Sequence, residues 1–256
     1  MSVHETIEQA LVAPRYLAGG GDPAWATVPL HRACGWSFGN DPLMPRVILT
    51  SPDQQADLRL DPAPDDQWWR LHHAATADRP AWWASFGART PVELIAAVLD
   101  ALTAPAAPPT AATDPLEPLR QAGWRWSPNS RISPDGIAEV EHFTDHGSNT
   151  WFITAAVGEG PEHHLWQARI NGNAPGHLVT AFTRALASPT PLVRDPFRLP
   201  PHTRQHAHIR TEQLPVKTVA FALERRIADL TARHASATTQ SPAAGAPRLP
   251  KPGRTR

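Results

Sequence analysis

The stretch SPDQQADLRL at residues 51–60 decides the fold, because it returns 82 residues later as SPDGIAEVEH at residues 133–142. The similarity extends beyond this stretch, since Gly35-Trp36 returns as Gly123-Trp124. The segment 82–105 also returns, with an offset of 84, as the segment 166–189. A fixed internal period of this length indicates two copies of one structural unit, which gain stability by sharing a core.

The composition of the 256-residue chain limits its class. The chain has no net charge, and 41% of its residues are hydrophobic. Residues 201–256 hold ten basic and three acidic residues, so an acidic body precedes a basic tail, unlike a uniformly basic nucleic-acid-binding protein. No apolar run reaches the roughly 18–20 residues of a membrane span, and residues 1–10 lack the basic start of a signal peptide. We therefore expect a cytoplasmic protein without a membrane partner.

Alternating apolar and polar residues predict the strands. Ala56, Leu58 and Leu60 alternate with Asp57 and Arg59, which is typical of a half-buried strand. Strand spacing is also found at residues 36–38 and 124–126. We expect the main strands at 47–49, 56–60, 68–74 and 82–86 in the first copy, and at 137–143, 150–157 and 165–170 in the second.

A helix closes each copy. Thr90, Pro91 and Glu93 predict a capping box with proline at the first helical position, and an apolar stripe continues to Leu102. The second copy repeats this pattern over residues 175–186. The sequence therefore predicts an α+β fold, a pseudo-twofold duplication of a β-β-β-β-α unit whose antiparallel sheet carries the helix on one face.

Segments of different composition divide the chain. Residues 104–114 are rich in proline and alanine, as in an extended linker. The apolar stripe from Val216 to Leu230 predicts an appended helix over 211–235. We expect an N-terminal segment with a short helix over 4–12 and the first repeat in 1–103, the linker in 104–114, the second repeat in 115–200, the appended helix in 201–235, and a disordered basic tail in 236–256.

Comparison of the two copies separates the faces of the sheet. Apolar residues match at alternating positions, such as Leu71 and Ile153 or Trp82 and Trp166, which indicates the helix-covered face. The residues between them point outward. This outward set contains Arg59, Trp68, Arg70, His72 and Trp83 in the first copy, and Glu139, Glu141, Phe152, Thr154, Gln167 and Arg169 in the second.

The outward aromatic and arginine side chains favour a nucleic-acid ligand, because single strands stack their bases on aromatic rings while arginine binds their phosphates. We predict a non-enzymatic protein that binds single-stranded DNA, with the first copy dominating since glutamate repels phosphate. Alternatively, the second copy, the last helix or a partner subunit covers this face. A protein-interaction or homodimerisation module would use the same face or the 216–230 helix stripe. The predicted nucleic-acid-binding residues are Arg59, Trp68, Arg70, Trp83, Phe152 and Arg169.

Residues that could support catalysis or metal binding form no recognisable motif. Gly-x-Ser-x-Gly is missing, and the glycines at 19–21 are followed by Asp-Pro rather than by the lysine of a phosphate-binding loop. Cys34, the single cysteine, is expected to be a small buried thiol, because a catalytic cysteine needs a histidine nearby in space. His202, His206 and His208 lie close together in sequence without an accompanying carboxylate. We expect no enzyme activity, no cofactor and no metal.

Several motifs occur together between residues 14 and 200: PRYLAGGGDP at 14–23, Pro29-Leu30, Gly35-Trp36, Ser51-Pro52-Asp53, Trp82 and Thr90-Pro91-x-Glu93. As a set, they resemble the actinobacterial family catalogued as domain of unknown function 317. The resemblance implies a protein of the Streptomyces type with tandem copies of the domain. It implies no activity, so no catalytic residues are assigned from it. By architecture, two strand-rich units each closed by a helix also resemble the Whirly and Pur-type single-stranded nucleic-acid binders.

Overall fold

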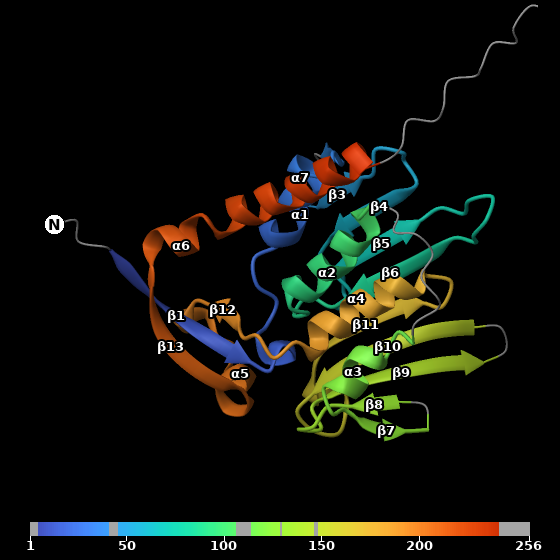
Figure 1. Cartoon of the computed structure of the whole chain (residues 1–256). Coiled ribbons are helices and arrows are strands. Elements are labelled where there is room, and N and C mark those ends of the chain that lie inside the picture. Colours follow the sequence, from blue (N-terminus) through green and yellow to red (C-terminus); the bar gives the residue numbers. More distant parts are fainter. Residues whose placement is uncertain (1–4, 41–45, 106–113, 129, 146–147, 241–256) are drawn as a thin grey trace, which may run out of the picture.

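A ten-stranded antiparallel sheet forms the centre of the computed structural model, which describes residues 5–40, 46–105, 114–128, 130–145 and 148–240 (Figure 1). The strand order is β2-β3-β4-β5-β6-β11-β10-β9-β8-β7, so each repeat contributes five neighbouring strands. The first repeat supplies β2 (Ser37–Asn40), β3 (Val47–Thr50), β4 (Ala56–Leu60), β5 (Trp69–His73) and β6 (Trp82–Phe86). The second supplies β7 (Arg125–Ser127), β8 (Ser130–Ile132), β9 (Ala138–Asp145), β10 (Ser148–Ala156) and β11 (His164–Asn171).

The two repeats join through β6 and β11. Ser85 pairs with Arg169, and Phe86 pairs with Ala168. Because β6 and β11 are corresponding strands, this pairing relates the repeats by an approximate twofold axis, and the predicted duplication is confirmed. Each repeat has five strands instead of about four, since the spacing seen at 36–38 and 124–126 adds an edge strand to both units.

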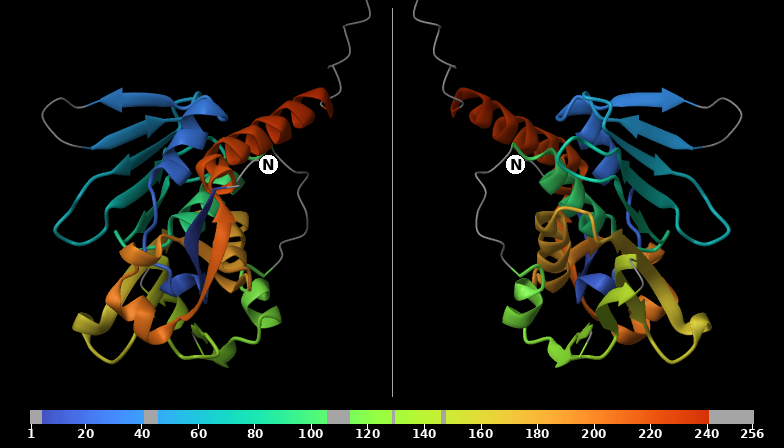
Figure 2. Two further views of the ribbon diagram at one scale, coloured as in Figure 1. Left: turned by 90° about the vertical axis from the view of Figure 1, so that its left-hand side faces the viewer. Right: turned by 90° about the vertical axis from the view of Figure 1, so that its right-hand side faces the viewer.

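Two helices, α2 (Val92–Thr103) and α4 (Gly176–Ala187), pack against each other on one face of the sheet (Figures 1 and 2). Phe86 is fully buried beneath them, and its ring stacks 5.9 Å from that of Phe182 on α4. Trp82 and Trp166 each expose 2% of their surface. The predicted helix-covered face is therefore confirmed. Two helices that the sequence did not indicate, α1 (Ala24–Arg32) and α3 (Glu117–Gln121), precede β2 and β7.

The Ser-Pro-Asp stretch forms the same turn in both copies. The Ser51 hydroxyl donates to Asp53 (2.6 Å) and accepts the N–H of the residue five positions later (2.9 Å). The Ser133 hydroxyl makes the same two bonds, donating to Asp135 at 2.5 Å and accepting an N–H at 2.9 Å. These bonds fix the turn that leads into β4 and β9. Asp135 gains a further partner, because the phenol of Tyr16 donates to it (2.8 Å).

The predicted capping box at Thr90 does not form. Helix α2 begins at Val92, and the Thr90 hydroxyl is buried without a hydrogen-bond partner among the described residues. Glu93 instead forms a two-point ion pair with Arg194 (2.6 and 2.7 Å). The N–H of Val92 donates to the Gly20 carbonyl (2.7 Å). Groups from distant parts of the chain therefore bind the first turn of this helix, and the bonds between Glu93 and Arg194 are charge-assisted.

The two ends of the described chain pair in a second sheet, of order β12-β1-β13 (Figure 1). Strand β1 (Thr6–Ala13) lies between β12 (Leu192–Arg194) and β13 (His208–Pro215). The predicted helix over 4–12 is therefore wrong, and so is the helical assignment of 211–215. Residues as distant as Ile7 and Leu214 pair in this sheet, and such pairing overrides weak local helix preference.

A long helix follows the terminal sheet. After α6 (Val216–Ala220), α7 (Ala222–Gln240) packs on α1 (Figure 2). Ile227 and Leu230 of the predicted apolar stripe are buried within the chain. Arg226 forms a two-point ion pair with Asp100 of α2 (2.7 and 3.0 Å). The helix passes the predicted end at 235. Residues 106–113 of the predicted linker and 241–256 of the predicted tail lie outside the described residues.

Short helical segments complete the fold. These are α5 (Pro201–His206) and the 3-10 turns η1 (Arg15–Leu17), η2 (Pro161–His163) and η3 (Pro196–Arg198). None of the helices in the described ranges has both the length and the apolar character needed to cross a membrane.

Candidate functional site

Four of the six predicted nucleic-acid-binding residues lie in one row across the open face of the central sheet. Arg59 of β4 pairs with Arg70 of β5, and Arg70 pairs in turn with Ser85 of β6. Ser85 pairs with Arg169 of β11, and Arg169 pairs with Phe152 of β10. Neighbouring strands lie about 4.8 Å apart, so these five residues, the arginine row, extend over roughly 19 Å and cross the junction of the two repeats.

Trp83 lies beside the arginine row. It is two residues from Ser85 on β6, hence on the same face, and it pairs with His72 of β5. Trp83 exposes 40% of its surface, and His72 is exposed as well. Helices α2 and α4 occupy the other face, and the second repeat extends the sheet sideways (Figure 1). Within the described chain, Trp83 and His72 are therefore accessible, whereas Ser85, in the middle of the row, is buried and its hydroxyl donates to Gln67 (2.9 Å).

Two arginines of the row have carboxylate neighbours. A guanidinium nitrogen of Arg59 lies 3.3 Å from Asp57, and one of Arg70 lies 3.2 Å from Asp65. Arg169 donates to a glutamine on its own strand (2.8 Å). The side chains of Arg59 and Arg70 are about half exposed, and ion pairs of that kind contribute at most about 1 kcal/mol. An anion that displaced these carboxylates would therefore lose little ion-pair energy.

The end of the row in the second repeat is acidic. Glu141 of β9 pairs with Phe152, and Glu139 lies two residues further along the same face. Burial raises the pKa of the Glu141 carboxyl, and the nearby Glu139 carboxylate raises it further. The open face therefore changes from arginine on β4, β5 and β11 to glutamate on β9.

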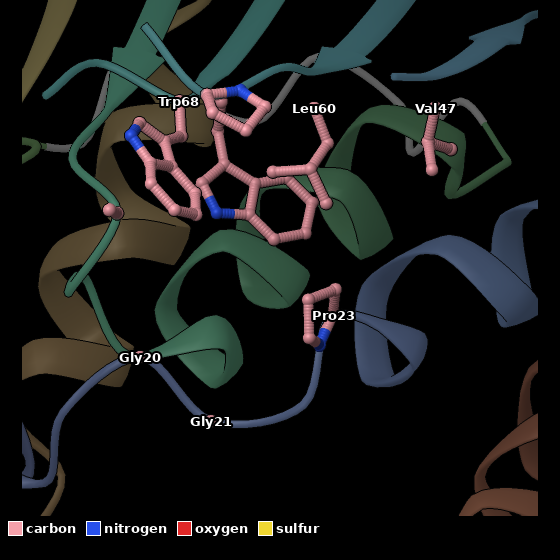
Figure 3. Close-up of a pocket in the computed structure, with 9 residues that line it drawn as sticks. Gly20, Gly21, Pro23, Val47, Leu60 and Trp68 are labelled. Atoms are coloured by element: carbon pink, nitrogen blue, oxygen red, sulfur yellow. The ribbon is translucent and has the colours of Figure 1, made fainter. Parts of the chain in front are cut away.

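Trp68 does not join the arginine row. It precedes β5, and its N–H donates to the carbonyl of Asp66 (3.1 Å), a residue with a left-handed φ of 58°. The chain therefore turns just before β5, and the strand alternation that predicted an outward Trp68 does not extend to this residue. Trp68 instead lines a pocket of about 290 Å³ with the turn at Gly20-Gly21, Pro23 and Trp69 (Figure 3).

This pocket is apolar and lies apart from the row. Its other lining residues are Val47, Leu60, Pro62 and Ala88. Val47, Leu60 and Trp69 are cross-strand neighbours in the helix-covered layer of the sheet. None of its lining residues has a charged side chain.

Sequence reasoning missed an aromatic residue on the open face. Phe143 of β9 exposes 52% of its surface. It lines an open groove of about 700 Å³ with Glu141, His142, Thr144 and Phe152. The period of two along β9 places Phe143 on the same face as Glu141, so the alternation of this strand carried the signal.

Cys34 lies beside His234 of α7, with Sγ and Nε2 3.5 Å apart. Burial raises the pKa of the Cys34 thiol, which favours its neutral form. A nucleophilic cysteine acts as a thiolate, so this geometry agrees better with a packing role. In the part of the chain that the structure describes, no three His, Cys, Asp or Glu side chains gather closely enough to hold a metal ion.

Comparison with known families accounts for the repeat. The family model described as SPDY, domain of unknown function (DUF317), matches residues 50–108 and 132–192. The chain carries two tandem copies of this domain. Each SPDY copy starts at the Ser-Pro-Asp turn and runs through the closing helix, α2 or α4. Every predicted site residue lies inside one of the two SPDY copies. No curated protein and no solved structure gives a significant match to the chain.

Proposed function

We propose that the tandem SPDY domains bind single-stranded nucleic acid, DNA in the first place, without catalysing a reaction. The observation that carries the proposal is the unbroken strand pairing of the arginine row across both repeats. With Trp83 beside it, the row combines positive charge and exposed aromatic surface, which is what single strands bind in proteins of this kind.

The phosphates would run along the row, across the strands of the sheet. Arg59 and Arg169 lie three strand spacings apart, about 14 Å, with Arg70 between them. Guanidinium groups bind phosphate oxygens through paired N–H donors. Since the ion pairs of Arg59 and Arg70 are exposed, phosphate competes with their carboxylate partners.

The bases would stack on Trp83 and on Phe152. Trp83 is exposed and lies next to the arginines of the first repeat, whereas Phe152 is half-buried and ends the row on the other side. A stacked base contributes about 1–3 kcal/mol, whatever its identity. The proposal therefore includes weak sequence preference.

The charge distribution supports binding mainly through the first repeat. Glu139 and Glu141 repel phosphate at the far end of the row. The segment 201–256, with its excess of seven basic residues, adds attraction that does not depend on base sequence. We place this activity in the cytoplasm.

Fluorescence anisotropy of a labelled single-stranded oligonucleotide with the full-length chain tests the proposal. We expect binding at low salt that weakens steeply as salt rises. A duplex of the same sequence should bind more weakly, because its bases are already stacked. The absence of binding at low salt would contradict the proposal. Equal affinity for the duplex would mean that the chain binds nucleic acid by charge alone, without stacking of bases.

A further inference from the structure

The outer edge of β13 has no strand partner in the described part of the chain. Strand β13 pairs along its length with β1, and β1 pairs on its other side with β12, so β13 ends the terminal sheet (Figure 1). All residues of β13 are exposed or half-buried. An exposed edge of eight residues is a template for pairing with another strand.

The pairing with β1 decides which main-chain groups of β13 face outward. The N–H of Val216 donates to the carbonyl of Glu5 (3.0 Å), one position beyond the end of the ladder. Hydrogen-bonded pairs alternate along an antiparallel ladder, so the even-numbered residues of β13 bond to β1. The N–H and C=O groups of Ile209, Thr211 and Gln213 therefore point away from β1.

We propose that a second copy of the chain pairs with this edge, antiparallel, with Thr211 on the twofold axis. Outward-facing residues must oppose each other in such a ladder, which leaves central registers centred on residue 210, 211 or 212. The register centred on 210 places the Arg210 side chains of the two copies opposite each other, and the register centred on 212 does the same with Glu212. Like charges directly opposite each other are unfavourable. The register centred on Thr211 places Arg210 opposite Glu212 of the partner subunit, on both sides of the axis.

Proline favours the same register. Pro215 faces outward and has no N–H to donate. In the register centred on 212, it would oppose Ile209 of the partner subunit and leave that carbonyl without a partner. In the register centred on Thr211, Pro215 lies beyond the last pair. The hydrogen-bonded pairs are then Ile209 with Gln213, on both sides, and Thr211 with itself.

The side chains at this edge suit a second copy. Arg210 and Glu212 form an ion pair within the strand (2.6 Å), and pairing two copies would set four alternating charges together. Ile209, also on β13, exposes 37% of its surface. The product is one continuous sheet of order β12-β1-β13-β13-β1-β12 that leaves no β13 edge open, with the same patch on both subunits.

Sedimentation velocity of the full-length chain over a range of concentrations tests this inference. The wild type should form a dimer that dissociates on dilution. Arg210→Glu places a carboxylate opposite Glu212 of the partner subunit on both sides of the axis. It should raise the Kd of the dimer about tenfold. Glu212→Arg should do the same, and the double exchange Arg210→Glu with Glu212→Arg should restore the wild-type Kd. Arg198→Glu, at an exposed position outside the sheet, is the control for charge reversal and should leave the dimer unchanged.

A backbone variant separates the edge from the charges. Thr211→Pro removes the outward N–H on the axis and takes no bond from β1, so the monomer should keep its Tm while the dimer is lost. A strict monomer at every concentration would overturn the inference, as would a dimer insensitive to Thr211→Pro and to the charge reversals. The assay contains no nucleic acid, so its outcome is independent of the proposed function.

Discussion

Arg169 pairs directly with Ser85 where β11 meets β6, and this single contact line makes the open faces of the two SPDY copies continuous. Arg70 pairs with Ser85 from the other side. The two arginines, from different repeats, are thus separated by two strand spacings, about 10 Å. The candidate site therefore belongs to the duplicated chain, and neither copy alone contains the whole row.

The stacking role of Trp83 is tested by comparison with Trp126. Trp83→Ala should weaken binding of single-stranded DNA by about 1–3 kcal/mol, roughly 5- to 150-fold in Kd, because one base loses its aromatic platform. Trp126 exposes 70% of its surface at the sheet edge. It lies on the helix-covered face, because it pairs with Arg131, which pairs in turn with the buried Val140. Trp126→Ala should leave Kd unchanged in the same anisotropy assay. An equal loss of affinity in both variants would show that the bases do not stack on the open face.

The arginine row should determine the salt dependence of binding. The slope of log K against log salt is negative, and each phosphate contact to a single strand contributes about 0.7 to its magnitude. Replacing Arg59, Arg70 and Arg169 together by alanine should therefore reduce that magnitude by about 2. Arg120→Ala is the control, because Arg120 is exposed on α3 with a carboxylate partner, Glu117. An unchanged slope in the triple variant would mean that the phosphates bind elsewhere.

The internal duplication made much of the fold predictable. Trp82 and Trp166 occupy corresponding positions in the two copies. Because an apolar residue recurs at this position, comparison of the copies predicted that both side chains lie beneath the helices. Pairing of the chain ends was not predictable, since β1 and β13 meet through contacts between distant residues. The start of α2 was misread for a similar reason. Its local signal at Thr90 was sound, but Arg194, a hundred residues away, holds Glu93.

The candidate site was predictable wherever a regular strand continues. Arg59, Arg70, Trp83, Phe152 and Arg169 all lie within strands, so a period of two assigned them to one face. Trp68 lies one residue before β5, where the positive φ of Asp66 ends the alternation. The likeness to Whirly and Pur-type proteins stays a prediction at the level of architecture.

The ion pair between Arg226 and Asp100 should anchor α7. Their side chains expose 14% and 23%, so Arg226→Ala leaves a largely buried carboxylate and should lower the free energy of unfolding by about 2–3 kcal/mol. Arg32→Ala, which removes an ion pair between α1 and α7, is the control. Its pair with Glu224 is about half exposed and should cost less than about 1 kcal/mol. Urea unfolding of the two variants checks the ranking, and equal losses would contradict it.

Tyr16 should make the stability sensitive to alkaline pH. Burial raises the pKa of its phenol, and the hydrogen-bonded Asp135 carboxylate raises it further. A raised folded-state pKa means that this stabilisation is complete below the unfolded pKa of about 10 and is lost as pH rises beyond it. Tyr16→Phe should cost about 1.5–2 kcal/mol at neutral pH, as a bond to a charged acceptor is lost.

The difference between wild type and Tyr16→Phe should shrink above pH about 10. Tyr16 is the single tyrosine of the chain, so an absorbance titration of the native protein reports its ionisation directly. Ionisation of the native protein at the ordinary tyrosine pKa would show that the phenol is not held as described.

Ultraviolet cross-linking of single-stranded DNA to the full-length chain, followed by mass spectrometry of the linked peptides, tests the central claim most directly. We expect the cross-links on the peptides that contain Trp83 and Phe152, and excess salt should remove them. Cross-links confined to residues 201–256, or to the pocket around Trp68, would contradict that claim.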